Sequence, residues 1–166
     1  MQKKVFQLLV DNTSGVLSRI AGLFSRRGYN IDSITAGVTA DPRYTRITIV
    51  TSGDDEILEQ IEKQVAKLVD VRDIKELKPG ESVYRELALI KVRVTSARDR
   101  IDVFAVANAY RADPVDVSPG SITIELIGDQ DKIDAFIAVL DGYEILEVAR
   151  TGIAGLSRGI DQVTYL

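Results

Sequence analysis

The segment LVDNTSGVLSRIAGLFSRRGYNIDSI, residues 9–34, contains the end of one strand, a whole helix and the start of another strand. Apolar residues recur at helical spacing between Val16 and Phe24. Gly28 follows two arginines and stands where a left-handed residue would end the helix. The stretch therefore predicts an amphipathic helix that connects two strands.

Small or polar residues, Asp11 to Gly15, separate the first strand from this helix. Thr13 or Ser14 can serve as the N-cap, and Gly15 would leave the backbone N–H groups of the first helical turn open to a ligand. A helix start favours negative charge. The loop therefore predicts either a plain capped turn or a cradle for an anion, and the loop alone leaves both alternatives open.

The same order of elements occurs twice along the chain. In the first half we expect strands and helices at 5–10, 16–27, 30–38, 44–51, 54–68 and 69–77. In the second half we expect them at 87–95, 101–109, 113–117, 121–127, 129–140 and 143–149. Both halves open their second helix with Gly-Asp, at Gly53-Asp54 and Gly128-Asp129. Each half thus follows the order βαββαβ.

This order is typical of the ferredoxin-like fold, so we predict an α+β protein made of two such units. The first domain covers residues 1–77 and the second covers 84–158. A linker lies at 78–83, where KPGES breaks both periodicities, and a tail follows at 159–166. Units of this size are marginally stable alone, so we expect them to pair within or between chains.

Composition excludes several classes of function. The chain has 166 residues, no cysteine and no histidine, which removes disulfides, thiolate catalysis, cysteine zinc sites and the commonest general base. The formal net charge of −4 disfavours nucleic acid and anionic lipid as partners. We find neither a signal peptide nor an apolar stretch of about 20 residues. We therefore expect a cytoplasmic protein without a membrane span.

Two further features bear on the loop. Asn30 follows the helix end and would project its amide from the start of the second strand, where it offers both a donor and an acceptor. The hairpin strands mix apolar residues with threonine and serine, such as Thr35 and Thr48. We expect helices on one face of this sheet, and we expect a partner at its edge or on its other face.

Two segments, DNTSGVLSRIAGLFSRRGYNIDSITAG (11–37) and DPRYTRITIVTSGDDEILEQIEKQVAKLVDV (41–71), resemble the ACT domain of the small regulatory subunit of acetolactate synthase, also called acetohydroxyacid synthase. The resemblance covers essentially the whole chain. It includes LIKV (89–92), DAFIAVL (134–140) and EVARTGIAGLSRG (147–159). The second half is more divergent in this family.

The resemblance implies a non-catalytic subunit that assembles with a thiamine diphosphate-dependent large subunit. Such a subunit raises the activity of its partner and transmits feedback inhibition by a branched-chain amino acid, typically valine. Residues 1–77 would form an effector-binding ACT domain that dimerises side by side with a second copy, and residues 84–158 would form a regulatory domain. Thiamine diphosphate, Mg²⁺ and FAD would belong to the large subunit, and this chain would hold no cofactor or metal.

The resemblance also places the effector on particular residues. The effector-binding residues would be Asn12, Ser14, Gly15, Val16 and Leu17, with Asn30 and Ile31 across the dimer interface. The loop would hold the carboxylate of the amino acid, and Asn30 would hold its α-amino group or its carboxylate. Val16 and Leu17 could line the side-chain pocket, although for Val16 a place in the helix core is at least as good an interpretation.

Three other functions need to be weighed. A catalytic function would need Asp, Glu, Lys or Tyr as acid or base, and no pair of these stands out. An RNA-binding module of the same topology needs aromatic residues on its central strands, and the third strand offers only Tyr44 at its edge. A free-standing ACT-domain sensor that regulates another enzyme is the main alternative. Co-purification with a thiamine diphosphate enzyme would separate the sensor from a subunit.

Overall fold

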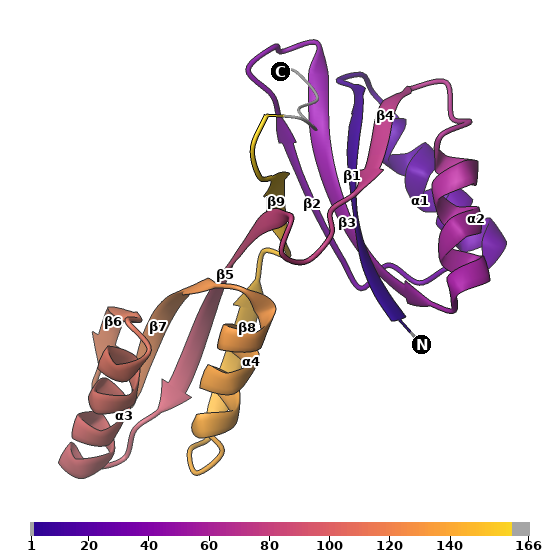
Figure 1. The fold of residues 1–166 in the computed structure, drawn as a ribbon. Helices are drawn as coiled ribbons and strands as arrows, with labels where there is room; N and C mark the ends of the chain where they lie inside the picture. The colour runs from indigo at the N-terminus through magenta and orange to yellow at the C-terminus, as the bar shows by residue number, and fades with distance from the viewer. Residues whose placement is uncertain (1, 161–166) are drawn as a thin grey trace. The chain divides into compact units, whose positions relative to one another are not determined.

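The computed structural model describes residues 2–160, which form two compact units. Residues 2–83 and 153–160 make the first unit, and residues 84–152 make the second (Figure 1). Strand β5 (Ser82–Arg93) begins in the first unit and continues into the second. Among the helices of the described residues, none is long and apolar enough to cross a lipid bilayer.

The first unit is an antiparallel sheet with two helices on one face (Figure 1). Its elements are, in chain order, β1 (Gln2–Asp11), α1 (Val16–Arg27), β2 (Ser33–Val38), β3 (Tyr44–Gly53), α2 (Asp55–Val65) and β4 (Val71–Glu76). The strands lie in the order β2-β3-β1-β4. The predicted ferredoxin-like fold is therefore confirmed for this unit.

The core of the first unit lies between the sheet and the helices. Phe6 and Leu8 of β1 stand in register with Ile49 and Ile47 of β3, and all of them are buried against the helices. The buried stripe of α1 consists of Val16, Ile20, Leu23 and Phe24. Gly28 ends α1 in the left-handed conformation (φ 69°), as predicted. The helical periodicity thus predicted these buried residues correctly, whereas Leu17 and Ala21, which belong to the same apolar pattern, are exposed.

The opposite face of this sheet is covered in part by the C-terminal segment of the same chain. Gln7 and Thr48 are paired in register on this face, and both are buried. The Gln7 Nε2 donates a hydrogen bond to the Gly155 carbonyl oxygen at 2.6 Å. Gly155 belongs to β9 (Ala154–Ser157), which pairs with β5. The chain itself therefore covers part of the sheet face on which a partner was expected.

These contacts place the C-terminal segment differently from the sequence-based domain limits. Those limits put residues 153–158 in the second domain, whereas the structure holds them in the first unit. Besides the contact to Gln7, the Arg158 N–H donates to the Glu81 carbonyl oxygen at 2.7 Å. Of the predicted tail, residues 161–166 lie outside the described residues.

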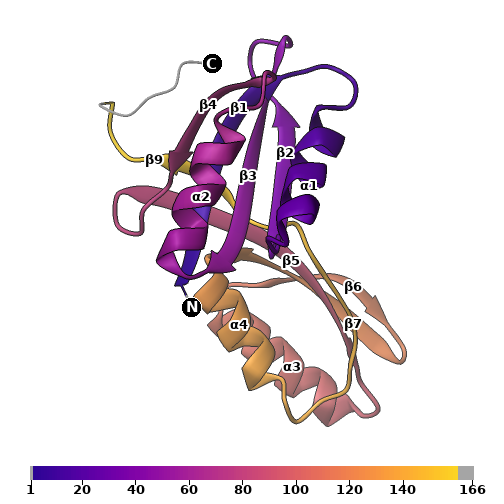
Figure 2. The ribbon, with the colours of Figure 1, turned by 90° about the vertical axis from the view of Figure 1, so that its right-hand side faces the viewer.

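The second unit repeats the topology of the first. After β5 it contains α3 (Ala97–Ala109), β6 (Asp113–Ser118), β7 (Ser121–Gly128), α4 (Gln130–Val139) and β8 (Ile145–Arg150). The strands lie in the order β6-β7-β5-β8, and Figure 2 shows α3 and α4 on the same face of this sheet. The second ferredoxin-like unit is thus confirmed. The predicted linker, 78–83, includes the first residues of β5, because that strand begins at Ser82.

The helix starts follow local hydrogen bonds. Asp54 and Asp129 each accept the N–H of the residue three positions later, both at 2.9 Å, so the predicted Gly-Asp helix openings are confirmed. Helix α3 begins at Ala97, earlier than predicted, because Ser96 and Asp99 form a reciprocal capping box. This capping box accounts for the extra turn of α3.

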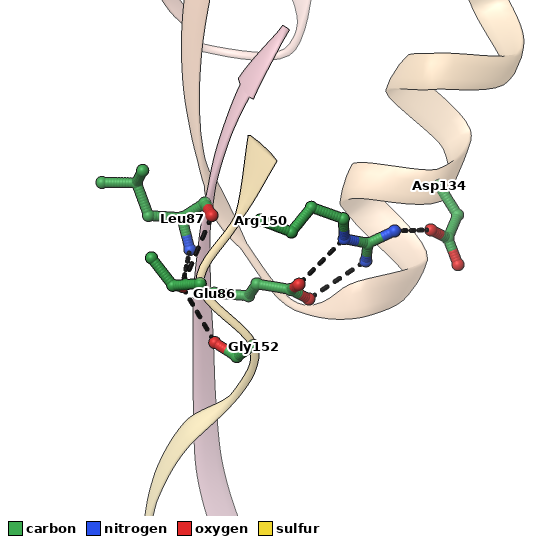
Figure 3. A network of polar contacts seen from close by, with 6 residues as sticks. Glu86, Leu87, Asp134, Arg150 and Gly152 are labelled. Atoms are coloured by element: carbon green, nitrogen blue, oxygen red, sulfur yellow. Dashed lines mark hydrogen bonds and ion pairs between the residues drawn. The ribbon is translucent and has the colours of Figure 1, made fainter. Parts of the chain in front are cut away.

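Figure 3 shows a polar network that ties β5, β8 and α4 together within the second unit. Arg150 donates through Nε and Nη2 to the Glu86 carboxylate, at 2.8 and 3.0 Å, and through Nη1 to Asp134 Oδ1 at 2.7 Å. The Glu86 side chain is only 3% exposed. A buried carboxylate that depends on one guanidinium is costly to leave unpaired, so this network is a structural requirement of the unit.

Candidate functional site

The loop between β1 and α1 is fixed by Asn12. The Asn12 N–H donates to the Arg43 carbonyl oxygen at 2.7 Å, and its Nδ2 donates to the Pro42 carbonyl oxygen at 2.8 Å. Its Oδ1 accepts from Thr45 Oγ1 at 3.2 Å. Both ends of the Asn12 amide are thus engaged within the chain. Asn12 therefore shapes the loop against the β2–β3 turn, and a ligand would meet the loop backbone instead of a free Asn12 amide.

The start of α1 carries no side-chain cap. Gly15 is the N-cap residue, in the left-handed conformation (φ 85°, ψ −4°), so the prediction that Thr13 or Ser14 caps this helix is wrong. With Asn12 tied to the neighbouring turn, the chain enters the helix through a left-handed residue, and glycine adopts that conformation without strain. The predicted place of Gly15 inside the first helical turn shifts by one residue, because α1 begins at Val16.

The absence of a cap distinguishes α1 from the other helices of the described residues. Helices α2, α3 and α4 each have a capping side chain and an acidic residue in the first turn, whereas α1 has neither. The first N–H groups of a helix need acceptors, and the helix dipole favours negative charge at that end. The start of α1 is therefore suited to bind an external anion such as a carboxylate.

Two arginine–aspartate pairs surround this loop. Arg72 donates to both oxygens of Asp11, at 2.7 and 2.6 Å, and Arg19 donates to both oxygens of Asp70, at 2.6 and 3.0 Å. The Asp11 N–H also donates to the Asp70 carbonyl oxygen at 2.9 Å. The hydrogen bond from Arg19 lowers the pKa of Asp70 below its usual value, so the carboxylate stays charged at neutral pH. The pairs hold the loop to the start of β4, through Arg72, and the start of α1 to the residue before β4, through Asp70.

Sequence reasoning missed these charged residues. The paired residues are 51 and 61 positions apart in the sequence, and local sequence patterns do not predict contacts between residues so far apart. One signal was present for Arg19, which follows Gly15 by four residues, the spacing that brings a helical side chain over the residue one turn earlier.

The predicted loop residues differ in their exposure. Val16 is 4% exposed and lies in the core of the first unit. This position agrees with the interpretation of Val16 as a core residue of the helix and not as part of a ligand pocket. Leu17 is 49% exposed, and Ser14 is also exposed. Of the two residues considered for a side-chain pocket, only Leu17 is therefore open to a ligand or to a partner.

Asn30 lies in the loop before β2, not at the start of the strand as predicted, because β2 begins at Ser33. Its Nδ2 donates to Asp32 Oδ1 at 2.6 Å, and its carbonyl oxygen accepts from Thr51 Oγ1 at 2.5 Å. These bonds hold the segment in an irregular conformation. Asn30 is exposed, whereas Ile31 is half-buried and packs against the core.

One chain does not bring the two halves of the predicted site together. Gly15 precedes α1 and Asn30 follows it, and α1 has 12 residues. At 1.5 Å per residue, the helix separates the two positions by about 18 Å. A single amino acid could contact both residues only if a second copy of the chain supplied one of them.

An edge strand with exposed apolar side chains is available for such a copy. Strand β2 lies at the edge of the first sheet. Ile34 and Val38 on this strand are 37% and 59% exposed. An exposed edge can pair with another strand, and the apolar side chains favour burial against a partner.

The chain has no histidine or cysteine, and within the described residues no group of three or more acidic residues is placed to hold a metal ion. The uncapped start of α1 offers N–H donors to an anion, and Leu17 offers an apolar contact beside it.

Comparisons with known proteins agree with this architecture. Residues 6–73 match the model of the AHAS small subunit-like ACT domain, and residues 85–159 match the model of the small subunit of acetolactate synthase. The chain is 48% identical to the acetolactate synthase isozyme 3 small subunit of Salmonella typhimurium over 95% of this chain and 96% of that one. It is 46% identical to the probable acetolactate synthase small subunit of Methanothermobacter thermautotrophicus over 93% and 92% of the two chains.

A solved structure shows the same fold over nearly the whole length. The crystal structure of the acetolactate synthase small subunit from Thermotoga maritima is 40% identical to the chain, with a TM-score of 0.86. The match covers 96% of this chain and 99% of that one.

Proposed function

Because the chain belongs to the family of acetolactate synthase small subunits, we propose that it is the regulatory subunit of an acetolactate synthase. It raises the activity of a thiamine diphosphate-dependent large subunit and makes that activity sensitive to valine. The observation that carries the proposal is the start of α1, where Gly15 leaves the helix without a side-chain cap or an acidic first turn.

Valine would bind with its carboxylate on the N–H groups at the start of α1. The helix end offers these donors together with the positive end of the dipole, and no side chain of the loop competes for them as a cap. The isopropyl group would contact Leu17, which is about half exposed. Asn12 would act indirectly, by holding the loop in shape through its bonds to Pro42 and Thr45.

The effector site would be completed by a second copy of the chain. Pairing of two β2 edges would cover Ile34 and Val38 and bring Asn30 and Ile31 of one copy towards the Gly15 loop of the other. The Asn30 Nδ2 already donates to Asp32, so its Oδ1 would accept from the ammonium group of valine. Because each site would draw on both copies, valine would stabilise the dimer.

The catalytic machinery would belong to the partner. Thiamine diphosphate, Mg²⁺ and FAD would be bound by the large subunit, and this chain would bind no cofactor of its own. The complex would work in the cytoplasm.

Reconstitution tests the proposal. The cognate large subunit is assayed for acetolactate formation while the purified chain is added in increasing amounts. We expect the rate to rise and then level off as the complex forms, and we expect both proteins to elute together from a sizing column. An unchanged rate, with the two proteins eluting apart, would point to a free-standing sensor of another enzyme.

A further inference from the structure

Arg19 places its guanidinium group beside the uncapped start of α1. The Arg19 N–H donates to the Gly15 carbonyl oxygen at 3.0 Å, in the first hydrogen bond of the helix. Helical side chains lean towards the N-terminus, so this side chain returns over Gly15. Its Nη1 lies 3.0 Å from the position that a Cβ on Gly15 would take. The guanidinium thus lies directly beside the space that a capping side chain at residue 15 would enter.

Asp70 holds this guanidinium by one edge only. Arg19 Nε donates to Asp70 Oδ2 at 2.6 Å, and Arg19 Nη2 donates to Asp70 Oδ1 at 3.0 Å. The Asp70 carbonyl oxygen also accepts the Asp11 N–H at 2.9 Å, which ties the aspartate to the loop. Within residues 2–160, Nη1 has no hydrogen-bond acceptor. The free nitrogen therefore faces the loop on a side chain that is already fixed in orientation.

We propose that Arg19 is a carboxylate-binding residue of the effector site and that Asp70 is its positioning residue. The inference rests on the proposed function, because it concerns the same amino-acid ligand. A guanidinium has five N–H donors in a rigid plane, so it can bind one carboxylate with one edge and a second carboxylate with the other. The fixed orientation lowers the conformational entropy that binding has to remove.

The pair as a whole is neutral, which defines what Arg19 would recognise. Asp70 cancels the net charge of the guanidinium, so Arg19 acts through a directed, charge-assisted hydrogen bond more than through long-range attraction. The site should therefore distinguish valine, which has a carboxylate, from valinamide, which has none. This selection would add to that of the helix N–H groups.

Calorimetry of valine and valinamide binding to the full chain tests this role. Arg19→Gln removes the donor, and Arg72→Gln is the matched control, because Arg72 forms a similar two-point pair with Asp11 beside the same loop. Arg19→Gln should weaken valine binding about 10- to 100-fold, the usual range for one charge-assisted hydrogen bond. It should leave valinamide binding within about threefold of the parent, whereas Arg72→Gln should not change the ratio of the two affinities. Arg19→Lys should recover part of the lost valine affinity.

The outcomes separate this inference from the proposed function. If the parent chain binds valine and Arg19→Gln binds it equally well, or no worse than Arg72→Gln does, Arg19 has only a structural role. If Arg19→Gln weakens valine and valinamide by the same factor, the arginine shapes the loop and does not recognise the carboxylate. If the parent chain does not bind valine at all, the proposed function fails, and the role of Arg19 fails with it.

Discussion

Gly15→Asp tests the geometry of the loop most sharply. Gly15 has φ 85°, a conformation in which an L-residue is strained by about 1 kcal/mol or more. For a unit of 60 to 100 residues, a loss of 1 kcal/mol in the free energy of unfolding lowers Tm by about 4 to 8 °C. The fold of the first unit should therefore survive the substitution.

The effect of Gly15→Asp on valine binding should be much larger. The new Cβ would lie 3.0 Å from Arg19 Nη1, at the flexible end of a side chain that can move. The added carboxylate would then bind the helix N–H groups and the guanidinium, in place of the carboxylate of valine. The loss of one or two charge-assisted hydrogen bonds corresponds to about 2 to 3 kcal/mol, or roughly 30- to 150-fold in Kd.

The matched control for this substitution is Gly80→Asp. Gly80 has φ 82°, and nothing lies within 4 Å of the position its Cβ would take, so the backbone strain is similar and the loop of the site is untouched. Thermal unfolding and calorimetry are measured on both variants. Gly15→Asp should lose valine affinity and Gly80→Asp should keep it. A Gly15→Asp chain that binds valine within threefold of the parent would show that the loop is only a helix start.

Three other predictions concern assembly, stability and titration. Val38→Glu, on the exposed β2 edge, should convert the proposed dimer into a folded monomer in sedimentation. Val69→Glu, at a residue 83% exposed before β4, should leave the proposed dimer intact. Arg150→Ala should lower the free energy of unfolding of the second unit by about 3 kcal/mol in denaturant titration, because it leaves the buried Glu86 carboxylate without its guanidinium partner. Arg93→Ala, which breaks an exposed pair with Glu144, should cost less than about 1 kcal/mol. Hydrogen bonds from Arg43 lower the pKa of Asp41 to about 2. The contribution of the Asp41 carboxylate to the free energy of unfolding should therefore be complete above pH about 4 and should disappear as the pH falls through about 2. NMR titration of the Asp41 carboxyl carbon measures this pKa.

Much of the fold could be predicted from local sequence signals. The alternation of strand and helix periods, the helix stop at Gly28 and the two Gly-Asp openings gave the order of elements in both units. Strand β9 could not be predicted in this way, because it has four residues and is held by Gln7, 148 positions away in the sequence. A contact at that distance leaves no periodic pattern in the segment that makes it.

The local structure of the candidate site could be predicted only in part. Gly15 was expected to leave the first helical turn open, but glycine tolerates either sign of φ, so the sequence alone does not show that Gly15 stands in place of a side-chain cap. The use of the Asn12 amide depends on a turn at Pro42, and the orientation of Arg19 depends on Asp70. These features follow from tertiary contacts, which local propensity does not report.

The proposed regulation requires that this chain make the rate of a catalytic partner depend on valine. The most direct measurement is a valine titration of acetolactate formation by the cognate large subunit, with and without a saturating amount of the chain. Valine should leave the large subunit alone unaffected and should inhibit the complex. The complex with the Gly15→Asp chain should be activated but insensitive to valine. Equal inhibition of the large subunit with and without the chain would contradict the proposed regulation.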